Sequence, residues 1–600
     1  MAKKAKEQKL PKQSRTPQIT EENRYAVFGM LFVFLVLVFF ASSYKVTGDD
    51  DFFWHLATGR YIVENKTVPD KDVFGFVTQG VEWIAFEWGW DVLSYGLYNV
   101  GGYNLILIFR SLVFCLIFYI YFLLLKKFKL TSFVSILVLF TLLVSIMDRL
   151  SPRPHILTYL FFTLLLYIFL SFKYIDRDTY FKKLYFLPLI FLLWSNIHMG
   201  VLAGGLLLFI FVISETMIFY KPNLFSSPEI KPLTSTQLKT LFIISAICAL
   251  MLLVNPHGLQ TYIYAYSHTK MKMLKTVNEW QSPFASKLDF GFIITLYKVF
   301  LFSGLIVLAY AYKKKDLTFA LVFIGFALYS VRAIRFTVDY EIIMAFFISV
   351  SINYFILRLF KKNFTVMNAL RGNFLVVAIA VFIIYVITQI PSNNIYATLK
   401  YYRVFGWGIN DEFIPVQLFD FMKQNNISGT PYNHFGTGGY LVWNFPEQRN
   451  FIDSRNLNDE IFNEYNSIMV MKPGFEKILD ERGINYVVYL DPDLIRRPND
   501  LKRLVTNYFS RNSNWKLVFW DDKSMLFIKN IPKFSGVIEK YEYKVIHPYT
   551  ALFHKQEFDS NVKANPDRAN DELIRKAQTD ANGYLFRGMN EMAVKLLQGL

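Results

Sequence analysis

Eleven apolar runs dominate the first 400 residues and restrict the possible folds more than any other feature of the chain. A helix needs roughly 20 apolar residues to cross a bilayer, and about 17 is the lower end of the range. The runs lie at 25–43, 103–125, 130–147, 155–172, 184–197, 199–220, 238–254, 290–312, 317–331, 339–357 and 373–392, the fifth and ninth being short. They predict a polytopic α-helical membrane protein with about 11 spans. This odd number places the two ends of the chain on opposite sides of the membrane.

The positive charge of the chain gives the orientation of these spans. A net charge of +17 is compatible with nucleic-acid binding, but in a membrane protein it more often reflects basic cytoplasmic loops. The short basic connections are 126–129, 173–183, 221–237, 313–316 and 358–372. All of them lie inside if the N-terminus is cytoplasmic, as the positive-inside rule requires. We therefore expect no nucleic-acid partner and a multi-pass protein of the inner membrane.

The remaining segments divide the chain into further parts. Residues 1–24 are basic and precede a run without an A-x-A-type cleavage site, which predicts a cytoplasmic tail and an uncleaved first span. The transmembrane domain covers 25–400, with a large first outer loop at 44–102. Short β-type runs alternate with amphipathic stretches at 401–530, which predicts an extracytoplasmic α/β domain, and 531–600 read as a helical tail. Cys115 and Cys248 lie inside apolar runs, so no disulfide framework follows.

The motif DDDFFWHLATGR, at 49–60, is the most unusual polar segment on the outer side. Asp49 and Asp51 have the D-x-D spacing, which suits a shared divalent cation or a general base acting on a hydroxyl. The alternative is a solvated acidic loop that keeps the segment outside. The aromatic residues at 52–54 favour a site, because aromatic side chains anchor at the membrane interface and would hold the acids at headgroup depth.

Other outer segments supply further polar side chains. Glu87 stands between tryptophans in WIAFEWGWD, either as a desolvated acid or as a buried hydrogen-bond acceptor. Arg332 and Arg335 are three residues apart, so one helical turn would place both on one face as a phosphate clamp. Arg60 could pair with the acids or bind phosphate. The other candidates, for which a structural role at a helix end is the alternative, are Trp54, His55, Arg153, His155, Asn196, His198, His257 and Glu279.

Two strings stand out in the soluble region, HFGTGGYLVW at 434–443 and FIDSR at 451–455. Gly438 and Gly439 allow a close backbone approach or a tight turn into a helix. No Lys-Ser/Thr pair follows, so this is not a phosphate-binding P-loop. Asp453 and Arg455 either support the membrane site or only close the domain.

Taken in order, these strings resemble the GT-C superfamily of polytopic glycosyltransferases. The resemblance is to an uncharacterised bacterial branch related to protein O-mannosyltransferases, aminoarabinose transferases and oligosaccharyltransferases. It rests on DDDFFWHLATGR, EWIAFEW, RPH, WSNIHMG, NPHG, EWQSP, GGYLVW and FIDSR. It implies an inverting transfer in which Asp49 acts as base and Asp51 as its partner. Asp50 departs from the usual pattern and leaves the choice among the three acids open.

The sequence thus predicts a membrane glycosyltransferase that takes a sugar from a polyprenyl-phosphate-linked donor at the outer face. Asp49, Asp51 and Glu87 are the expected catalytic residues, and Arg60, Arg153, Arg332 and Arg335 the expected phosphate ligands. A divalent cation is a candidate cofactor, held by Asp49 and Asp51. The expected partners are the lipid bilayer, the lipid-linked sugar and a glycan, lipid or protein acceptor. The alternatives are a non-catalytic scaffold and a transporter of lipid-linked sugars, which would place its polar residues nearer the bilayer midplane.

Overall fold

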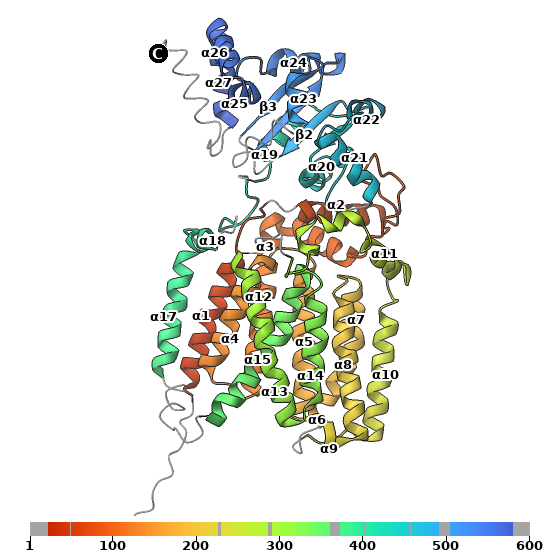
Figure 1. The fold of residues 1–600 in the computed structure, drawn as a ribbon, viewed down its shortest axis with the longest axis vertical. Helices are drawn as coiled ribbons and strands as arrows, with labels where there is room; N and C mark the ends of the chain where they lie inside the picture. The colour runs from red at the N-terminus through yellow and green to blue at the C-terminus, as the bar shows by residue number, and fades with distance from the viewer. Residues whose placement is uncertain are drawn as a thin grey trace, which may run out of the picture.

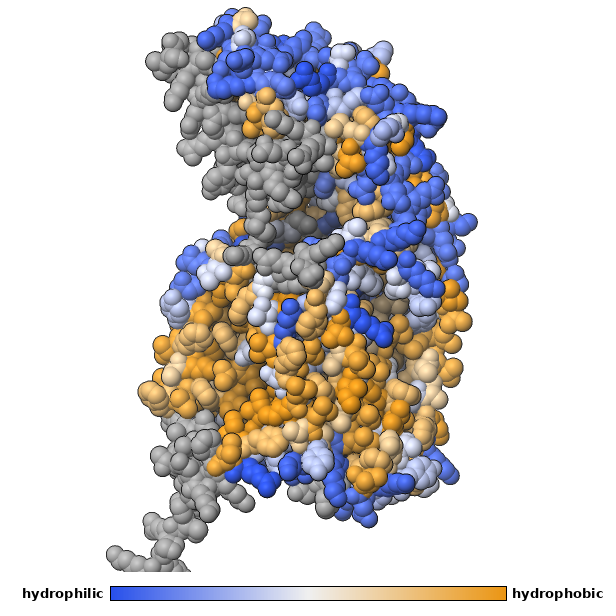
Figure 2. Space-filling view, in the orientation of Figure 1, coloured by the Kyte–Doolittle hydropathy of each residue, from blue (hydrophilic) through white to orange (hydrophobic). Residues whose placement is uncertain are grey.

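The computed structural model describes residues 22–47, 50–225, 230–285, 291–359, 373–399, 403–411, 413–455, 458–490, 505–521 and 523–579. They form a bundle of long helices with a smaller α/β unit on one end (Figure 1). Apolar side chains cover the visible face of the bundle, and hydrophilic side chains gather on the α/β unit and at the opposite end (Figure 2). This distribution is that of a membrane-embedded bundle carrying a water-exposed domain. The basic N-terminal tail and the end of the C-terminal tail lie outside the described residues.

Six helical segments are long and apolar enough to cross a membrane, namely Arg24–Ser42, Trp88–Lys127, His155–Tyr174, Val201–Tyr220, Gly291–Lys314 and Ile334–Leu359. Four shorter apolar helices accompany them, Ser132–Ser145, Ser235–Met251, Leu317–Ser330 and Phe374–Gln389. The predicted fifth span is divided between a 3-10 helix, Lys182–Phe186, and an α-helix of nine residues, Leu187–Ser195. The polytopic helical character is confirmed by these helices, whereas the count of about 11 spans is not confirmed.

The bundle is built from α1 (Arg24–Ser42), α3 (Trp88–Lys127), α4 (Ser132–Ser145), α5 (His155–Tyr174), α7 (Leu187–Ser195), α8 (Val201–Tyr220), α10 (Ser235–Met251), α12 (Gly291–Ser303), α13 (Leu305–Lys314), α14 (Leu317–Ser330), α15 (Thr337–Leu359) and α17 (Asn373–Gln389). Shorter elements connect them: α2 (Asp50–Asn65), η1 (Met147–Arg149), α6 (Arg177–Phe181), η2 (Lys182–Phe186), α9 (Pro222–Phe225), α11 (Gln260–His268), η3 (Lys272–Lys275), η4 (Asn278–Trp280), η5 (Ile334–Phe336) and α18 (Asn394–Thr398).

Local sequence signals explain where several of these helices begin. The Asn23 side chain accepts hydrogen bonds from the backbone N–H groups of Tyr25 and Ala26 and caps α1. Thr234 and Gln237 form a capping box at the start of α10. Such caps satisfy backbone donors that have no partner inside the helix. At these two helices a polar side chain in front of the apolar run therefore marks the start of the helix.

The first outer loop folds into two helices that lie on the end of the bundle. α2 occupies its first part, and the start of α3 occupies its last part. α3 is interrupted at Gly101 and Gly102, where Gly102 has a φ of +62° and a ψ of −159°, so the chain turns there before it enters the bundle. The expected loop end at residue 102 coincides with this kink. In Figure 1, α2 lies between the bundle and the α/β unit.

The α/β unit contains a four-stranded mixed sheet in the order β1-β2-β4-β3. β1 (Pro431–Asn433) is parallel to β2 (Tyr486–Leu490), and β4 (Ser524–Lys529) is antiparallel to both β2 and β3 (Trp515–Trp520). The β-type runs expected within 401–530 are confirmed by β2, β3 and β4. β1 has only three residues, too short for an alternating pattern to be read from the sequence.

Helices surround this sheet: α19 (Val416–Gln424), η6 (Phe435–Thr437), α20 (Gly438–Asn444), α21 (Asp459–Met469), α22 (Phe475–Glu481), α23 (Thr506–Arg511), η8 (Pro532–Phe534), α24 (Ser535–Tyr541), α25 (Pro548–Phe553), α26 (Lys555–Ala564) and α27 (Pro566–Thr579). The last of them pack on the sheet, because Phe558 and Leu573 share one hydrophobic core with Tyr432 and Phe527.

Candidate active site

Asp50 joins the first outer loop to the C-terminal domain. Its Oδ1 accepts hydrogen bonds from the backbone N–H groups of Gly439 (2.8 Å) and Tyr440 (3.2 Å), at the start of α20. Its Oδ2 accepts from the N–H (3.3 Å) and the hydroxyl (3.0 Å) of Ser454. The side chain is therefore buried and fully engaged, which gives Asp50 a docking role. Asp49, the expected base, lies outside the described residues.

Asp51 points toward the loop that precedes α5. Its Oδ2 lies 2.5 Å from Nη1 of Arg153, so the two side chains form an ion pair. Its Oδ1 accepts hydrogen bonds from Trp54 Nε1 (3.2 Å) and from the Ser454 hydroxyl. Both oxygens of Asp51 are thus engaged, and the carboxylate orients Arg153 at the same time.

Glu87 precedes α3 and lies between two histidines. Its Oε2 is 3.8 Å from Nε2 of His55, and its Oε1 is 3.7 Å from Nε2 of His198. Burial raises the pKa of Glu87 to about 8, although the charges of Arg335 and Arg153 act in the opposite direction. The sequence-based alternatives were a desolvated acid and a buried hydrogen-bond acceptor, and this geometry fits the first.

Both histidines beside Glu87 are neutral. Burial lowers the pKa of His55, and the charge of Arg153 adds to the effect. Burial together with Arg335 and Arg149 lowers the pKa of His198 to about 3. Nδ1 of His55 lies 2.5 Å from Oδ1 of Asp91, a buried acid on α3.

Close backbone packing brings the motifs of this site together. A Cβ at Gly59 on α2 would lie 2.1 Å from the carbonyl oxygen of Asp91 on α3, so only glycine allows the two helices to approach at this point. The Asn196 side chain accepts a hydrogen bond from Trp88 Nε1 (2.9 Å), and the Asn196 carbonyl accepts from the Gly89 N–H (2.9 Å). Asn196 thus holds the turn between α7 and α8 against the start of α3.

A cavity of about 290 Å³ opens beside the Asp51–Arg153 pair. Arg149, Arg153 and Arg403 line it together with the acids Asp148 and Glu279, and its other lining residues are Tyr44, Val46, Thr47, Ser151 and Pro152. Nη1 of Arg149 binds Glu279 at 3.0 Å. Burial acts to raise the pKa of Glu279, but Arg149, Arg335 and Arg153 outweigh it and hold that pKa well below its ordinary value. The cavity therefore carries three guanidinium groups on its wall.

Arg60 and Arg332, two of the expected phosphate ligands, do not line this cavity. Nη2 of Arg60 donates to the carbonyl of Val442 (2.9 Å), and its guanidinium lies over the Trp443 ring, so Arg60 holds α2 against α20. Arg332 is exposed in the turn before η5. The shared helical turn expected for Arg332 and Arg335 is wrong, because Ala333 between them is extended (φ −153°, ψ 146°). Arg335 itself stacks on Trp280 at 4.4 Å, near Glu87 and Glu279.

Two expected pocket histidines have local contacts. His155 begins α5 and its Nε2 donates to the carbonyl of Arg149 (2.9 Å), which holds the arginine loop. Among the described residues, His257 has no contact with Glu87, His55 or His198. Burial lowers the pKa of His257, and the charge of Asp70 acts in the opposite direction. Of the predicted pocket residues, the structure thus brings together Trp54, His55, His198 and Glu279 around Glu87 and Asp51.

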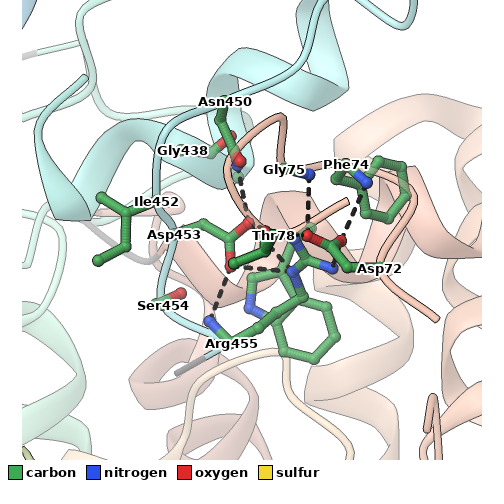
Figure 3. A network of polar contacts seen from close by, with 12 residues as sticks. Asp72, Phe74, Gly75, Thr78, Gly438, Asn450, Ile452, Asp453, Ser454 and Arg455 are labelled. Atoms are coloured by element: carbon green, nitrogen blue, oxygen red, sulfur yellow. Dashed lines mark hydrogen bonds and ion pairs between the residues drawn. The ribbon is translucent and has the colours of Figure 1, made fainter. Parts of the chain in front are cut away.

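Arg455 is the centre of a second polar network, shown in Figure 3. Its guanidinium binds Asp453 through Nε (2.9 Å) and Nη2 (2.6 Å) and binds Asp72 through Nη1 (2.7 Å). It also stacks on Trp83 at 4.4 Å. Asp72 and Trp83 come from the first outer loop, whereas Asp453 comes from the C-terminal domain. The FIDSR string therefore docks the domain onto the loop.

The sequence reasoning missed four residues that these contacts identify, Asp72, Asp91, Arg403 and Ser454. Asp91 could have been found from its place one helical turn after Glu87, on the same face of a predicted helix. Arg403 could have been noticed as the first arginine after the last apolar run. Asp72 and Ser454 carry no comparable signal, because their roles depend on which segments the fold brings together.

The described residues contain no group of three or more His, Cys, Asp or Glu side chains placed to hold a metal ion. Asp51, one of the two candidate ligands for a divalent cation, is paired with Arg153. Its Oδ2 is thus engaged with a guanidinium, and its Oδ1 accepts hydrogen bonds from Trp54 and Ser454.

Comparisons with known proteins give the fold. Neither a family model nor a curated protein matches the chain. Among solved structures, the chain is similar to the Archaeoglobus fulgidus oligosaccharyltransferase AglB in complex with an inhibitory peptide and a dolichol-phosphate, with a TM-score of 0.52, 11% identity and coverage of 83% of this chain and 73% of that one. It is also similar to that enzyme tethered to an acceptor peptide containing the NVT sequon (TM-score 0.52, 11% identity, 85% and 74% covered) and to its apo form (0.50, 12%, 85% and 75%). The resemblance expected from the sequence is thus confirmed for the fold.

Proposed function

We propose that this chain is a multi-pass glycosyltransferase that moves a sugar from a polyprenyl-phosphate-linked donor to an acceptor, with inversion. The observation that carries the proposal is the position of Arg153, which binds Asp51 and also lines the arginine-rich cavity. The Arg153 side chain thus connects the carboxylate of Asp51 with a cavity whose arginines suit an anion. The solved neighbours support the lipid-linked donor, since one of them holds a dolichol-phosphate.

The carrier phosphate would bind in the cavity. Arg149, Arg153 and Arg403 line it, and guanidinium groups suit phosphate oxygens because they donate two parallel hydrogen bonds. Arg335 would add positive charge from the side of Glu87. Among the four expected phosphate ligands, Arg60 and Arg332 are replaced by Arg149 and Arg403, since the first two do not line the cavity.

The chemistry follows from these positions. The nucleophilic atom of the acceptor loses its proton to a carboxylate and forms a bond to the anomeric carbon. The bond between that carbon and the phosphate oxygen breaks, and the phosphate leaves with the electron pair. The arginines stabilise the charge that develops on the phosphate. Asp49, Asp51 and Glu87 are the proposed catalytic acids, with Asp51 holding Arg153 in place.

The proposed membrane arrangement keeps the N-terminus in the cytoplasm and the α/β domain outside. About 11 crossings in a bacterial inner membrane would be supplied by the six long helices together with the shorter ones. Basic residues support this orientation, since Lys126 and Lys127 end α3 and Lys313 and Lys314 end α13 at the end of the bundle remote from the active site. The site would then face outward, where lipid-linked sugars are used.

A direct test measures transfer from lipid-linked sugars. The purified protein in lipid nanodiscs would be mixed with lipid-linked sugars extracted from bacterial membranes and with peptide, lipid and glycan acceptors. We expect a labelled sugar on one acceptor class, and about 100-fold less transfer from R153Q. R449Q, which changes an exposed arginine of the C-terminal domain, is the matched control. Absence of transfer by the unaltered protein from every donor would refute the proposal.

A further inference from the structure

Four side chains form a continuous polar line beside the cavity, in the order Asp91, His55, Glu87 and His198. Asp91 Oδ1 lies 2.5 Å from His55 Nδ1, and His55 Nε2 lies 3.8 Å from Glu87 Oε2. Glu87 Oε1 lies 3.7 Å from His198 Nε2. The line crosses from α3 to α2, back to the start of α3 and on to the turn before α8. Three parts of the chain, α2, the start of α3 and the turn before α8, therefore meet at Glu87.

The hydrogen bonds fix which nitrogen of each histidine carries a proton. Nδ1 of His198 accepts from the Gly200 N–H (3.0 Å) and lies 2.8 Å from the Thr158 hydroxyl. That hydroxyl accepts from Trp194 Nε1, so its own hydrogen is directed to His198. Nδ1 is thus an acceptor, and the N–H of the neutral ring is on Nε2, facing Glu87.

His55 has the opposite arrangement. The Nδ1–H of its ring donates to Asp91, whose other oxygen, Oδ2, is buried without a hydrogen-bond partner among the described residues. Burial and the charge of Glu87 raise the pKa of Asp91 well above its ordinary value, so this contact holds the ring in one orientation and tautomer and adds no negative charge beside it. Nε2 of His55 is then left with a free lone pair directed toward Glu87.

We infer that Glu87 accepts the proton of the acceptor, with His55, Asp91 and His198 as positioning residues. This inference rests on the proposed glycosyl transfer. The acceptor's X–H bond breaks, X bonds to the anomeric carbon, and the phosphate leaves with its electron pair. The proton goes to Glu87 Oε2, where the new O–H group faces Nε2 of His55. The N–H of His198 holds the second oxygen of Glu87. The gaps of 3.7 and 3.8 Å close by a small rotation of the carboxylate, as is usual when a substrate binds.

The surroundings favour Glu87 over Asp51 for this step. Both oxygens of Asp51 are engaged by Arg153, Trp54 and Ser454, whereas neither oxygen of Glu87 has a hydrogen bond as short as these. Burial raises the pKa of Glu87 to about 8, so the group exchanges a proton near neutral pH. The charged and titratable groups that face it are Asp51 and His55 of α2, Asp91 of α3, Arg153, His198, Glu279 of η4 and Arg335 of η5.

The pH dependence of transfer tests whether Glu87 accepts the proton. We expect transfer by the unaltered protein to rise with pH with a midpoint near 8, and E87Q to lose about 100-fold at every pH. H55A should lose about 100-fold, and added imidazole should restore part of it by occupying the space left by the ring. D91N should lose about 10-fold and should abolish the rescue of H55A in the double variant. E82Q, an exposed acid of the same loop, is the matched control and should leave transfer unchanged.

A second readout is independent of transfer. The infrared band of the protonated Glu87 carboxyl, identified by its loss in E87Q, should titrate near pH 8 and should shift in frequency in H55A, which removes the ring nitrogen that the Glu87 O–H group faces. A band that does not shift in H55A, or full transfer by E87Q with its loss confined to D49N, overturns the assignment of Glu87 as the proton acceptor. Absence of any transfer with the infrared shifts present refutes the glycosyl transfer and leaves the coupled acid–histidine cluster standing.

Discussion

Arg153 and Asp51 form an ion pair of 2.5 Å that connects three parts of the molecule. Arg153 belongs to the loop that enters α5 and lines the cavity, while Asp51 belongs to the first turn of α2. Asp51 also accepts a hydrogen bond from the Ser454 hydroxyl of the C-terminal domain. The helical bundle, the first outer loop and the domain therefore meet at one carboxylate. A movement of the C-terminal domain would therefore shift Asp51 and, with it, Arg153 at the proposed phosphate site.

The first prediction concerns binding of the lipid carrier. R153Q removes one of the three guanidinium groups of the cavity and leaves Asp51 without its ion-pair partner. We expect dolichyl phosphate in nanodiscs to bind about 10- to 100-fold more weakly, because a charge-assisted hydrogen bond contributes about 1.5–3 kcal/mol. Tryptophan fluorescence titration measures the affinity. R449Q should bind as the unaltered protein does, and equal weakening of both variants would point to a general charge effect.

The second prediction concerns the contact between Asp50 and α20. In G439A the new Cβ would lie 2.5 Å from the Asp50 carbonyl oxygen, so the helix start must move away and its hydrogen bonds to Asp50 lengthen. We expect a loss of about 1–3 kcal/mol of stability, measured as a lower thermal midpoint in detergent. G536A is the control, since a Cβ there meets nothing within 4 Å. An unchanged midpoint in G439A would contradict this close approach.

The third prediction concerns the pH dependence of stability. The pKa of Glu87 is raised to about 8 in the folded protein, above its ordinary value of 4.5. A raised carboxyl pKa favours the protonated form, so the stability that burial of Glu87 allows is present at low pH and is lost as pH rises toward and through 8. E87Q removes this dependence. The difference in thermal midpoint between E87Q and the unaltered protein should therefore grow in favour of E87Q from pH 5 to pH 9.

The fourth prediction concerns the docking of the C-terminal domain. R455Q leaves the buried carboxylates of Asp72 and Asp453 without their shared partner. Breaking a buried pair in this way costs about 3–5 kcal/mol. R482Q removes a partly exposed ion pair with Glu464 and should cost only about 0–1 kcal/mol. Limited proteolysis between the bundle and the domain would compare the two, and similar cleavage of both variants would argue against a docking role for Arg455.

Much of the fold could be predicted because it depends on local patterns. Long apolar runs specify helices wherever they occur, and the kink at Gly101 and Gly102 falls at the expected end of the first outer loop. The strand runs near 486, 516 and 525 are short and almost continuously apolar, as is typical of strands that are buried on both faces. The number of spans could not be predicted in this way. A nine-residue helix such as Leu187–Ser195 belongs to a continuous apolar run, but the 3-10 helix Lys182–Phe186 precedes it in the backbone.

The candidate site could also be predicted only in part. Asp51, Glu87, His55 and Arg153 could be selected from the sequence because charged and aromatic residues at the ends of apolar runs are unusual. Their partners could not be selected. Arg60 and Arg332 carry the same charge as Arg153, yet one faces α20 and the other lies exposed, because a single extended residue or the face of a helix decides where a side chain points.

The sequence by itself determined that this protein has a helical membrane bundle, a C-terminal α/β unit and a set of polar motifs between the spans. These properties follow from hydropathy and local conformation, which act over a few residues. Only the tertiary structure decided that Asp50 serves docking, that Asp51 holds Arg153 and that Asp91 reaches His55 from the next helix. Those contacts join residues far apart in the chain, and their geometry depends on how closely helices approach at positions such as Gly59 and Gly439.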